Sequence, residues 1–434
     1  MRLLLTLLAS VFLSLPQAIA AKSFKPQQWE TSHGARVVFY QAMEVPMLDI
    51  NIAFAAGSAY DGKQFGLSAL TTRLLNQGNA GLDANTIAEK LAETGAQYDS
   101  DTSRDMVVLS LKTLTSPTAL KAATDTVALI INHPDFTHEA FKREQNQQLM
   151  AIAQSLEAPE QVANQAFFKA LYQTHPYAHS INGDTDTVKV LRVEQVRNFY
   201  RQFFVNKNAL IVMVGAIDDA TAHQLAEKLT GRLPKGRTAA PIPKASPLKE
   251  EINIEIPFPA SQTFLRLGQL GIDHHDKHYF PLQVGNYILG GGGLVSRLAL
   301  EVREKRGLTY GVYSQFSPMP GLGPFVISLS TQGTQAATAT KVTRETLSSF
   351  ITTGPDEQEL LEAKQYMAGS FPLSLASNSS IADMLLKIAF YHLPDNYLDT
   401  YISQINAVNR SQIKQAFQQL ITPDTLLQVT VGKM

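Results

Sequence analysis

The stretch LRVEQVRNFYRQFFVNKNALIVMVG, residues 191–215, matches the end of the chain, VNRSQIKQAFQQLITPDTLLQVTVG, residues 408–432, without gaps. In both segments an amphipathic helical pattern is followed by the pattern of a strand. Corresponding positions hold side chains of the same kind: Val196 and Ile413, Tyr200 and Phe417, Val212 and Val429, Gly215 and Gly432. An internal repeat of a helix and a strand predicts two copies of one domain.

A segment rich in proline and glycine separates the two copies. GRLPKGRTAAPIPKASP, residues 231–247, contains four prolines and two glycines, which is typical of an extended linker. We therefore expect an N-terminal domain over residues 24–230 and a C-terminal domain over residues 248–434. Helical and strand periodicities are mixed along each half, with helices expected at 66–77, 83–94, 116–132 and 138–172. This order favours an α+β fold over a doubly wound parallel sheet.

The composition excludes several classes of protein. The 434 residues include 37 Lys and Arg against 38 Asp and Glu, so no overall charge favours binding to nucleic acid. There is no cysteine, which excludes disulfides, thiolate zinc sites and a lipid-modified N-terminal cysteine.

The start of the chain, MRLLLTLLASVFLSLPQAIA, has the pattern of a signal peptide over residues 1–20. One positive charge precedes an apolar run, and the segment ends in the small-residue pattern Ala18-Ile19-Ala20. No later segment is long and apolar enough for a membrane span. We expect a protein exported to the periplasm.

The most informative segment for function is YILGGGGLVSRLALEVREKRGLTYGVYSQF, residues 287–316. Four apolar residues are expected to share the buried face of a helix: Leu294, Val295, Leu298 and Val302. Arg303 then lies on the opposite side, and Gly307 follows two basic residues where the helix should end. From Tyr310 on, alternate residues form a strand pattern. The strand is expected to bring Tyr310 back to the helix end, close to Arg303.

The chain resembles the pitrilysin/insulinase family of zinc metallopeptidases, the inverzincins. It is most similar to the short two-domain branch related to mitochondrial processing peptidase. Residues 289–314 follow the family pattern almost residue for residue, and residues 55–78 and 175–191 follow it in layout. The resemblance covers nearly all of the chain after the signal peptide. It implies two homologous sandwich domains of helices and sheets, arranged as a clamshell around a cavity.

The chain departs from the family at the zinc-binding helix. Family members carry His-x-x-Glu-His there, and a later helix supplies a further glutamate. In this chain the three positions hold Ala69, Thr72 and Arg73, and the later ligand is expected near Met150, where no carboxylate stands. A guanidinium at a ligand position repels zinc. The resemblance therefore predicts that this chain binds no catalytic metal.

The family places an arginine and a tyrosine, spaced like Arg303 and Tyr310, against the substrate carbonyl. In heterodimeric members one subunit carries the zinc motif and the other supplies this pair. The resemblance implies that this chain is the second kind of subunit, with a zinc-bearing paralogue as partner and a peptide or unfolded protein as substrate. Gly291, Gly292 and Gly293 are expected to let the substrate backbone pass close by.

Other interpretations remain open. One is a non-enzymatic peptide-binding or scaffold homologue, for which no partner provides zinc. Taken singly, Arg303 is also compatible with a surface ion pair to Glu301 or another carboxylate, and Tyr310 with a position in the core. A third interpretation is an autonomous metalloenzyme that uses a histidine cluster: His274, His275 and His278. The alternative for that cluster is a polar entry to a helix, capped by Asp273 or Asp276.

Overall fold

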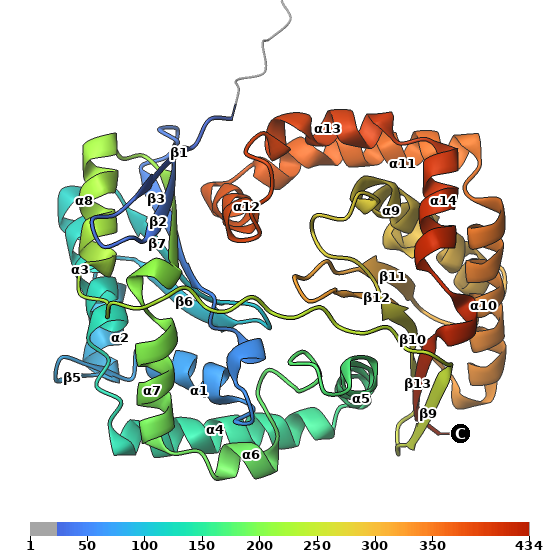
Figure 1. Ribbon diagram of the computed structural model, residues 1–434, viewed down its shortest axis with the longest axis horizontal. Coiled ribbons are helices and arrows are strands. Elements are labelled where there is room, and N and C mark those ends of the chain that lie inside the picture. The colour runs from blue at the N-terminus through green and yellow to red at the C-terminus, as the bar shows by residue number, and fades with distance from the viewer. Residues whose placement is uncertain (1–23, 434) are drawn as a thin grey trace, which may run out of the picture.

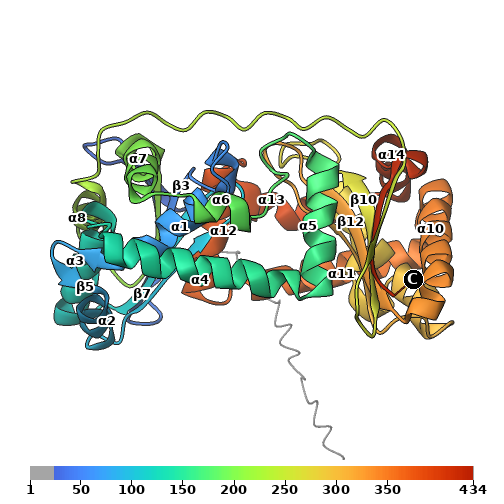
Figure 2. The ribbon, with the colours of Figure 1, turned by 90° about the horizontal axis from the view of Figure 1, so that it is seen from below.

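A computed structural model of the chain describes residues 24–433, and the expected signal peptide lies outside them. Two halves, each built on one β-sheet, lie side by side along the longest axis of the molecule (Figure 1). Between the end of α8 (Asp219–Thr230) and the start of β9 (Ile252–Pro257) the chain forms no helix or strand. This segment runs along one side of the molecule from one half to the other (Figure 2). It contains the linker expected over 231–247.

The N-terminal half is built on a six-stranded mixed sheet with the order β1-β2-β8-β3-β7-β6. Its strands are β1 (Gln27–Glu30), β2 (Arg36–Gln41), β3 (Met47–Phe54), β6 (Gln97–Thr102), β7 (Val107–Leu114) and β8 (Ala209–Gly215). Every residue of β8 is buried, because helices cover both faces of the sheet at this strand. A short hairpin, β4 (Gly78–Asn79) and β5 (Leu82–Asp83), lies outside the sheet.

The C-terminal half is built on a five-stranded sheet with the order β11-β12-β10-β13-β9. Its other strands are β10 (Thr263–Leu270), β11 (Val312–Phe316), β12 (Pro324–Thr331) and β13 (Leu427–Gly432). In the N-terminal sheet the last strand, β8, is parallel to β2 and antiparallel to β3. In the C-terminal sheet the last strand, β13, is likewise parallel to β9 and antiparallel to β10. The mixed sheets confirm the α+β class and exclude a doubly wound parallel sheet.

Helices pack on the outer face of each sheet. In the N-terminal half these are α1 (Leu67–Leu74), α2 (Ala84–Ala92), α3 (Pro117–Asn132), α7 (Val193–Phe203) and α8. In the C-terminal half they are α9 (Tyr279–Asn286), α10 (Ala336–Thr353) and α14 (Arg410–Leu420). The helix and strand expected in each of the two matching segments are present, as α7 with β8 and as α14 with β13. The descent of the two halves from one repeated unit stays a prediction.

The helix expected over 138–172 is two helices, α4 (His138–Leu156) and α5 (Pro159–Tyr172). Ala158 between them has an extended backbone, with φ −101° and ψ 110°. The cause is Pro159, because a proline disfavours helical backbone at the residue before it and lacks the N–H that a helix interior needs. The short α6 (Thr185–Lys189) follows in the same half.

The break lets α5 turn away from its own half and cover the inner face of the C-terminal sheet (Figure 2). Phe167 and Leu171 of α5 pack there with Leu427 and Val429 of β13. Arg266, buried in β10, donates from Nη2 to Oε1 of Glu160 at 2.9 Å.

The C-terminal half makes the reciprocal contact. It continues through α11 (Glu357–Ser370), α12 (Asn378–Phe390) and α13 (Tyr397–Ala407). Ile381 and Leu385 of α12 pack on Leu210 and Val212 in the N-terminal sheet (Figure 1). Each half therefore supplies the helix that buries the inner face of the other half's sheet. None of the helices within residues 24–433 combines the length and the apolar character needed to cross a membrane.

Candidate functional site

The segment that carries Arg303 is less regular than a single helix. Tyr287–Gly291 and Ala299–Glu304 are π-helical, and Gly293–Val295 forms a short turn between them. Ser296 is buried and extended, with φ −79° and ψ 155°, and its carbonyl oxygen accepts from the N–H of Leu300. The second helical piece therefore starts after Ser296.

This late start corrects the expected buried face. Leu298 and Val302 are buried as predicted, but Leu294 and Val295 are 60% and 76% exposed. They precede the helix, so helical spacing does not govern where they point.

The end of this helical segment agrees with the sequence. Gly307 has a φ of +60°, and its N–H donates to the carbonyl oxygen of Arg303 at 2.8 Å, while the N–H of Leu308 donates to that of Val302 at 3.0 Å. These two bonds satisfy carbonyls that a helix end leaves free. Arg303 is half-buried, with its Nε 3.5 Å from Oε1 of Glu304. Its guanidinium is partly open to solvent.

Tyr310 does not begin a strand. The strand β11 starts at Val312, and Tyr310 lies in the loop before it with 84% of its surface exposed. Among residues 24–433, no hydrogen bond or cation–π contact joins Tyr310 to Arg303. Within the described residues no direct contact of these kinds joins the two side chains, and their closeness stays a prediction. The phenol is presented to the outside, which also excludes the interpretation of Tyr310 as a core residue.

The glycine run has a structural role of its own. A Cβ on Gly290 would lie 2.5 Å from Oγ of Ser314 and 2.6 Å from its backbone nitrogen, so this position must be glycine for the segment to pack on β11. Gly293 has a φ of +63°, a conformation that side chains disfavour. Substrate contact by Gly291, Gly292 and Gly293 stays a prediction.

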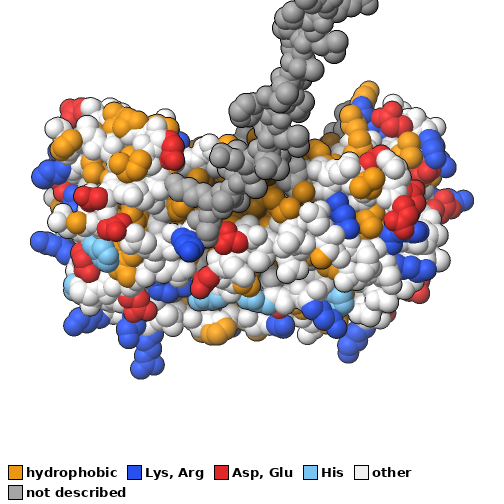
Figure 3. Space-filling model, turned by 90° about the horizontal axis from the view of Figure 1, so that it is seen from above, with side chains coloured by type: hydrophobic (Ala, Val, Ile, Leu, Met, Phe, Trp, Pro, Cys, Tyr) orange, Lys and Arg blue, Asp and Glu red, His pale blue; other side chains and the backbone are white. Residues whose placement is uncertain are grey.

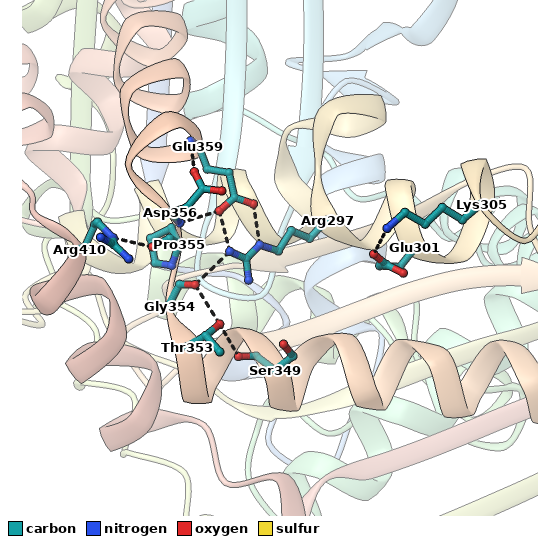
Figure 4. A network of polar contacts seen from close by, with 10 residues as sticks. All are labelled: Arg297, Glu301, Lys305, Ser349, Thr353, Gly354, Pro355, Asp356, Glu359 and Arg410. Carbon is teal, nitrogen blue, oxygen red and sulfur yellow. Dashed lines mark hydrogen bonds and ion pairs between the residues drawn. The ribbon is translucent and has the colours of Figure 1, made fainter.

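Arg297 anchors the segment to the rest of the half (Figure 4). Its Nε and Nη2 each donate to one carboxylate oxygen of Glu359 at 2.6 Å, and Nη2 also donates to the carbonyl oxygen of Gly354 at 3.0 Å. The guanidinium carbon lies 5.1 Å from the ring centre of Phe350. Bidentate pairs of this kind fix orientation as well as distance. The sequence offered no signal for this pair, because 62 residues separate its two members.

Replacing Arg297 by alanine is expected to lower the free energy of unfolding by about 2 kcal/mol. This is less than the loss for a fully buried pair, since both side chains keep some access to water. Denaturant unfolding followed by circular dichroism measures the change. Arg410 is the matched control: its pair with Glu357 is exposed, and its Nε donates to the carbonyl oxygen of Pro355 at 2.7 Å (Figure 4). Arg410→Ala should cost about 1 kcal/mol or less. Equal losses for the two variants would contradict the anchoring role.

The positions of the family's zinc helix line a polar cleft of about 490 Å³. Ala69, Thr72 and Arg73 of α1 form one wall, and the edge strand β6 contributes Ser100 to Thr102. Thr102 donates its hydroxyl to that of Thr72 at 2.9 Å. An alanine, a threonine and an arginine offer no nitrogen or carboxylate ligand for zinc, so these residues do not fit the family's metal.

One carboxylate of this cleft was missed from the sequence. Glu144 of α4 lines the cleft and is buried, with an Oε1 3.6 Å from Nε of Arg143. Burial raises the pKa of Glu144, and the positive charges of Arg143 and Arg73 lower it. Met150, where the ligand was expected, is 63% exposed and lies outside the cleft lining. The position expected for the family's later ligand therefore lies outside the cleft, and Glu144 is a carboxylate inside it.

The histidine cluster is a polar helix entry. Oδ1 of Asp273 accepts from the N–H of His275 at 2.9 Å, and Oδ1 of Asp276 accepts from the N–H of His278 at 2.7 Å. His274 stacks on Tyr391 with ring centres 3.9 Å apart, and burial lowers its pKa to about 4. Within residues 24–433 no three histidine or acidic side chains are grouped to hold a metal.

A buried acid joins the two halves at their centre. Asp105, between β6 and β7, accepts hydrogen bonds from the hydroxyls of Tyr177 and Tyr391, the latter at 3.0 Å. Burial raises the pKa of Asp105, and the two hydroxyls and Arg104 lower it. Tyr391 comes from the C-terminal half, directly after α12. No pattern in the sequence indicates this contact, because it joins residues that are distant in the chain.

Family models match most of the described chain. "Insulinase (Peptidase family M16)" matches residues 36–185, and "Peptidase M16 inactive domain" matches residues 191–367. Among curated proteins, the "Uncharacterized zinc protease YmxG" of Bacillus subtilis is 26% identical over 92% of this chain and 97% of its own length. The "Non-peptidase homolog YmxG" of Helicobacter pylori is 27% identical over 95% of this chain and 94% of its own length.

Solved structures have the same fold. A crystal structure of a protease from Helicobacter pylori superposes with a TM-score of 0.87 at 17% identity, covering 94% of this chain and 99% of its own. The crystal structure of a "peptidase M16 inactive domain" from Pseudomonas fluorescens superposes with a TM-score of 0.91 and is 36% identical, over 94% of this chain and 98% of its own. With its two mixed sheets and its altered zinc helix, the chain belongs to the M16 peptidase family.

Proposed function

We propose that this chain is the catalytically incomplete subunit of a heterodimeric zinc metallopeptidase in the periplasm. In this proposal Arg303 and Tyr310 act on a peptide held by a zinc-bearing paralogue. The observation that carries the proposal is the exposure of Tyr310, which is 84%, combined with a zinc helix that has lost its ligands. A phenol that contacts little of its own chain is available to a second one. The signal peptide predicted over residues 1–20 supports the location.

The chemistry of the pair suits peptide hydrolysis. Attack on a peptide bond builds negative charge on the carbonyl oxygen, and preorganised hydrogen-bond donors stabilise that charge. The guanidinium of Arg303 donates N–H groups, and the hydroxyl of Tyr310 donates one further hydrogen bond. Both groups have exposed surface. Arg303 lies near the end of the anchored, capped helical segment, and Tyr310 follows that cap directly.

The segment that carries the pair also has exposed apolar side chains. Leu294, Val295, Leu300 and Tyr313 are exposed, although large apolar side chains are more often buried. Contiguous exposed apolar surface marks sites of association in soluble proteins. These residues are the surface that we propose the partner covers. On the face shown in Figure 3 the basic and acidic side chains are interspersed, so that face has no large patch of a single charge that would attract a partner.

The test is a peptidase assay on the mature chain mixed with an exported paralogue that carries His-x-x-Glu-His. A quenched unstructured peptide should be cleaved only by the mixture, and a chelator should abolish cleavage. Arg303→Ala is expected to lower kcat of the mixture about 100-fold, because it removes one donor to the developing charge. Tyr310→Phe should also lower kcat, because it removes the hydroxyl donor while keeping the aromatic ring.

Matched controls are available within the same half. Arg306 pairs with Glu301 at 2.7 Å, and Tyr366 is an exposed tyrosine of α11, so Arg306→Gln and Tyr366→Phe should leave kcat unchanged. Light scattering after size exclusion reports whether each variant still assembles. Full activity of assembled complexes that contain the Arg303 and Tyr310 variants would refute the catalytic role.

The second candidate is a peptide-binding or scaffold protein without a proteolytic role. It is favoured by the similarity to a relative described as a non-peptidase homologue. No cleavage on mixing, together with a stable chain in isolation, would select this candidate.

A further inference from the structure

A large cleft lies where the two halves meet, away from Arg303 and from the altered zinc helix. Its volume is about 770 Å³, within the range of ligand-binding pockets. Residues 238–242 of the linker, the start of β2 and residues 273–275 and 390–392 all contribute to its lining. A ligand in this cleft would contact both halves at once.

Part of the cleft wall is apolar and aromatic. Tyr60, Pro241, Ile242, Pro320 and Phe390 line it. Tyr60 is held in place because its hydroxyl donates to the carbonyl oxygen of Ala240 in the linker at 3.2 Å. These side chains form a surface on which an apolar or aromatic group can pack.

Three acidic residues line the cleft, and two of them have partners within the chain, whereas Glu30 is exposed. Asp105 accepts hydrogen bonds from two tyrosine hydroxyls. Asp273 lies 3.0 Å from Nζ of Lys244 and accepts the N–H of His275. Their negative charges are therefore largely compensated by the chain itself.

The bases of the cleft are less well compensated. Arg36 is half-buried and donates from Nη1 to the carbonyl oxygen of Ala389 at 3.0 Å. No acidic residue between 24 and 433 forms an ion pair with Arg36 or with Lys207 in this structure. Burial lowers the pKa of Arg36, whereas the charge of Glu30 nearby raises it. An arginine stays ionised in proteins. The exposed carboxylate of Glu30 acts on Arg36 from beyond ion-pair distance, so it compensates this half-buried charge only in part.

Arg36 also stands at the meeting point of two clefts. A second cleft, of about 450 Å³, shares Glu30, Arg36 and His392 with the first. The space around the guanidinium therefore extends in two directions, which leaves room for a chain longer than a single residue.

We propose that this junction cleft binds a carboxylate carried next to an apolar or aromatic group. Arg36 is the partner of the carboxylate, Lys207 adds a second positive charge, and the apolar wall receives the neighbouring group. The C-terminal residue of a peptide has this chemistry, and so does a free acylated amino acid. The site is independent of the role proposed for Arg303 and Tyr310.

Isothermal titration of the mature chain tests the site with two pairs of probes. N-acetyl-phenylalanine is compared with its amide, and the peptide Ala-Ala-Ala-Ala-Phe is compared with its C-terminal amide. Each acid is expected to bind at least about tenfold more tightly than its amide, the effect of one charge-assisted hydrogen-bonded pair. Tighter binding of the peptide acid than of acetyl-phenylalanine would identify a peptide end as the ligand, and equal binding would identify the single residue.

Two variants assign the effect to the cleft. Arg36→Gln should remove the difference between acid and amide, whereas Arg201→Gln, at an exposed position on α7, should retain it. Lys207→Gln is expected to weaken the binding of both acids by about threefold. Because Lys207 is exposed, this variant provides the test if Arg36→Gln does not fold. Equal binding of acid and amide, absence of binding up to millimolar probe, or a difference that survives in Arg36→Gln would overturn the proposal.

Discussion

Residues 24–247, produced without the rest of the chain, are expected to remain unfolded or to aggregate. This piece contains a complete six-stranded sheet, but the helix that buries its inner face, α12, belongs to the other half. Without α12 the apolar side chains of Leu210, Val212 and Val214 would face water. At the same time α5 would lose the C-terminal sheet on which it packs.

The expected loss is comparable to the stability of a whole domain. Burial of a large aliphatic side chain contributes about 1.5 to 3 kcal/mol, and α12 buries Ile381, Leu385 and Leu386 in this contact. Typical domains are stable by only about 5 to 15 kcal/mol. Circular dichroism and amide NMR spectra of the isolated piece should show no cooperative fold, and adding residues 248–434 should restore it.

A single substitution tests the same contact in the full chain. Leu385→Ala should lower the free energy of unfolding by about 3 kcal/mol, because Leu385 is almost fully buried. Leu373, exposed in the turn before α12, is the control, and Leu373→Ala should change it by less than about 0.5 kcal/mol. A cooperative unfolding transition of the isolated N-terminal half would show that the exchange of helices is not needed for folding.

Restoring the family's motif is expected to create a zinc site at positions 69, 72 and 73, whose present side chains offer no zinc ligand. The variant carries Ala69→His, Thr72→Glu and Arg73→His. Two imidazoles would then line the cleft that already contains the carboxylate of Glu144, and three ligands of this kind suffice for zinc with a bound water. Removing Arg73 also removes a positive charge from the site. Atomic absorption should find about one zinc per chain after dialysis, and the starting protein should retain none.

The third ligand can be identified by two further changes. Adding Glu144→Gln to the restored motif should abolish zinc retention, because an amide is a poor zinc ligand. If Met150→Glu, added to that variant, restores zinc binding, the third ligand belongs at position 150, as the alignment with the family predicts, and not at Glu144. If the variant with Glu144→Gln retains zinc while Met150 is unchanged, Glu144 is not the third ligand.

Some features of this protein follow from the sequence because they depend on neighbours along the chain. The helices that follow Asp83 and Ser116 are examples, since helical hydrogen bonds and the spacing of apolar side chains on one helix face are local properties. The cap at Gly307 was predicted for the same reason. The loss of zinc ligands at Ala69, Thr72 and Arg73 needed only an alignment with the family.

Other local signals in the sequence conflict with the apolar periodicity, and there the structure follows the local signal. Pro159 already marks the break between α4 and α5, and Ser296 marks the start of the second helical piece in the Arg303 segment. The apolar spacing continues across both positions, so periodicity alone predicts one unbroken helix in each case. Tyr310 follows the alternation of β11, yet the strand begins two residues later, since a strand also needs a partner for its hydrogen bonds.

By itself the sequence determined the mixed α+β class, several of the helices and strands, and the absence of the zinc motif. Only the tertiary structure decided that α5 and α12 each cover the sheet of the other half, that Glu144 lines the altered zinc cleft, and that Arg36 lies at the junction. The physical reason is the same in each case. Periodicity shows that one face of an element is buried, but the surface that covers it is chosen by contacts between residues far apart in the chain.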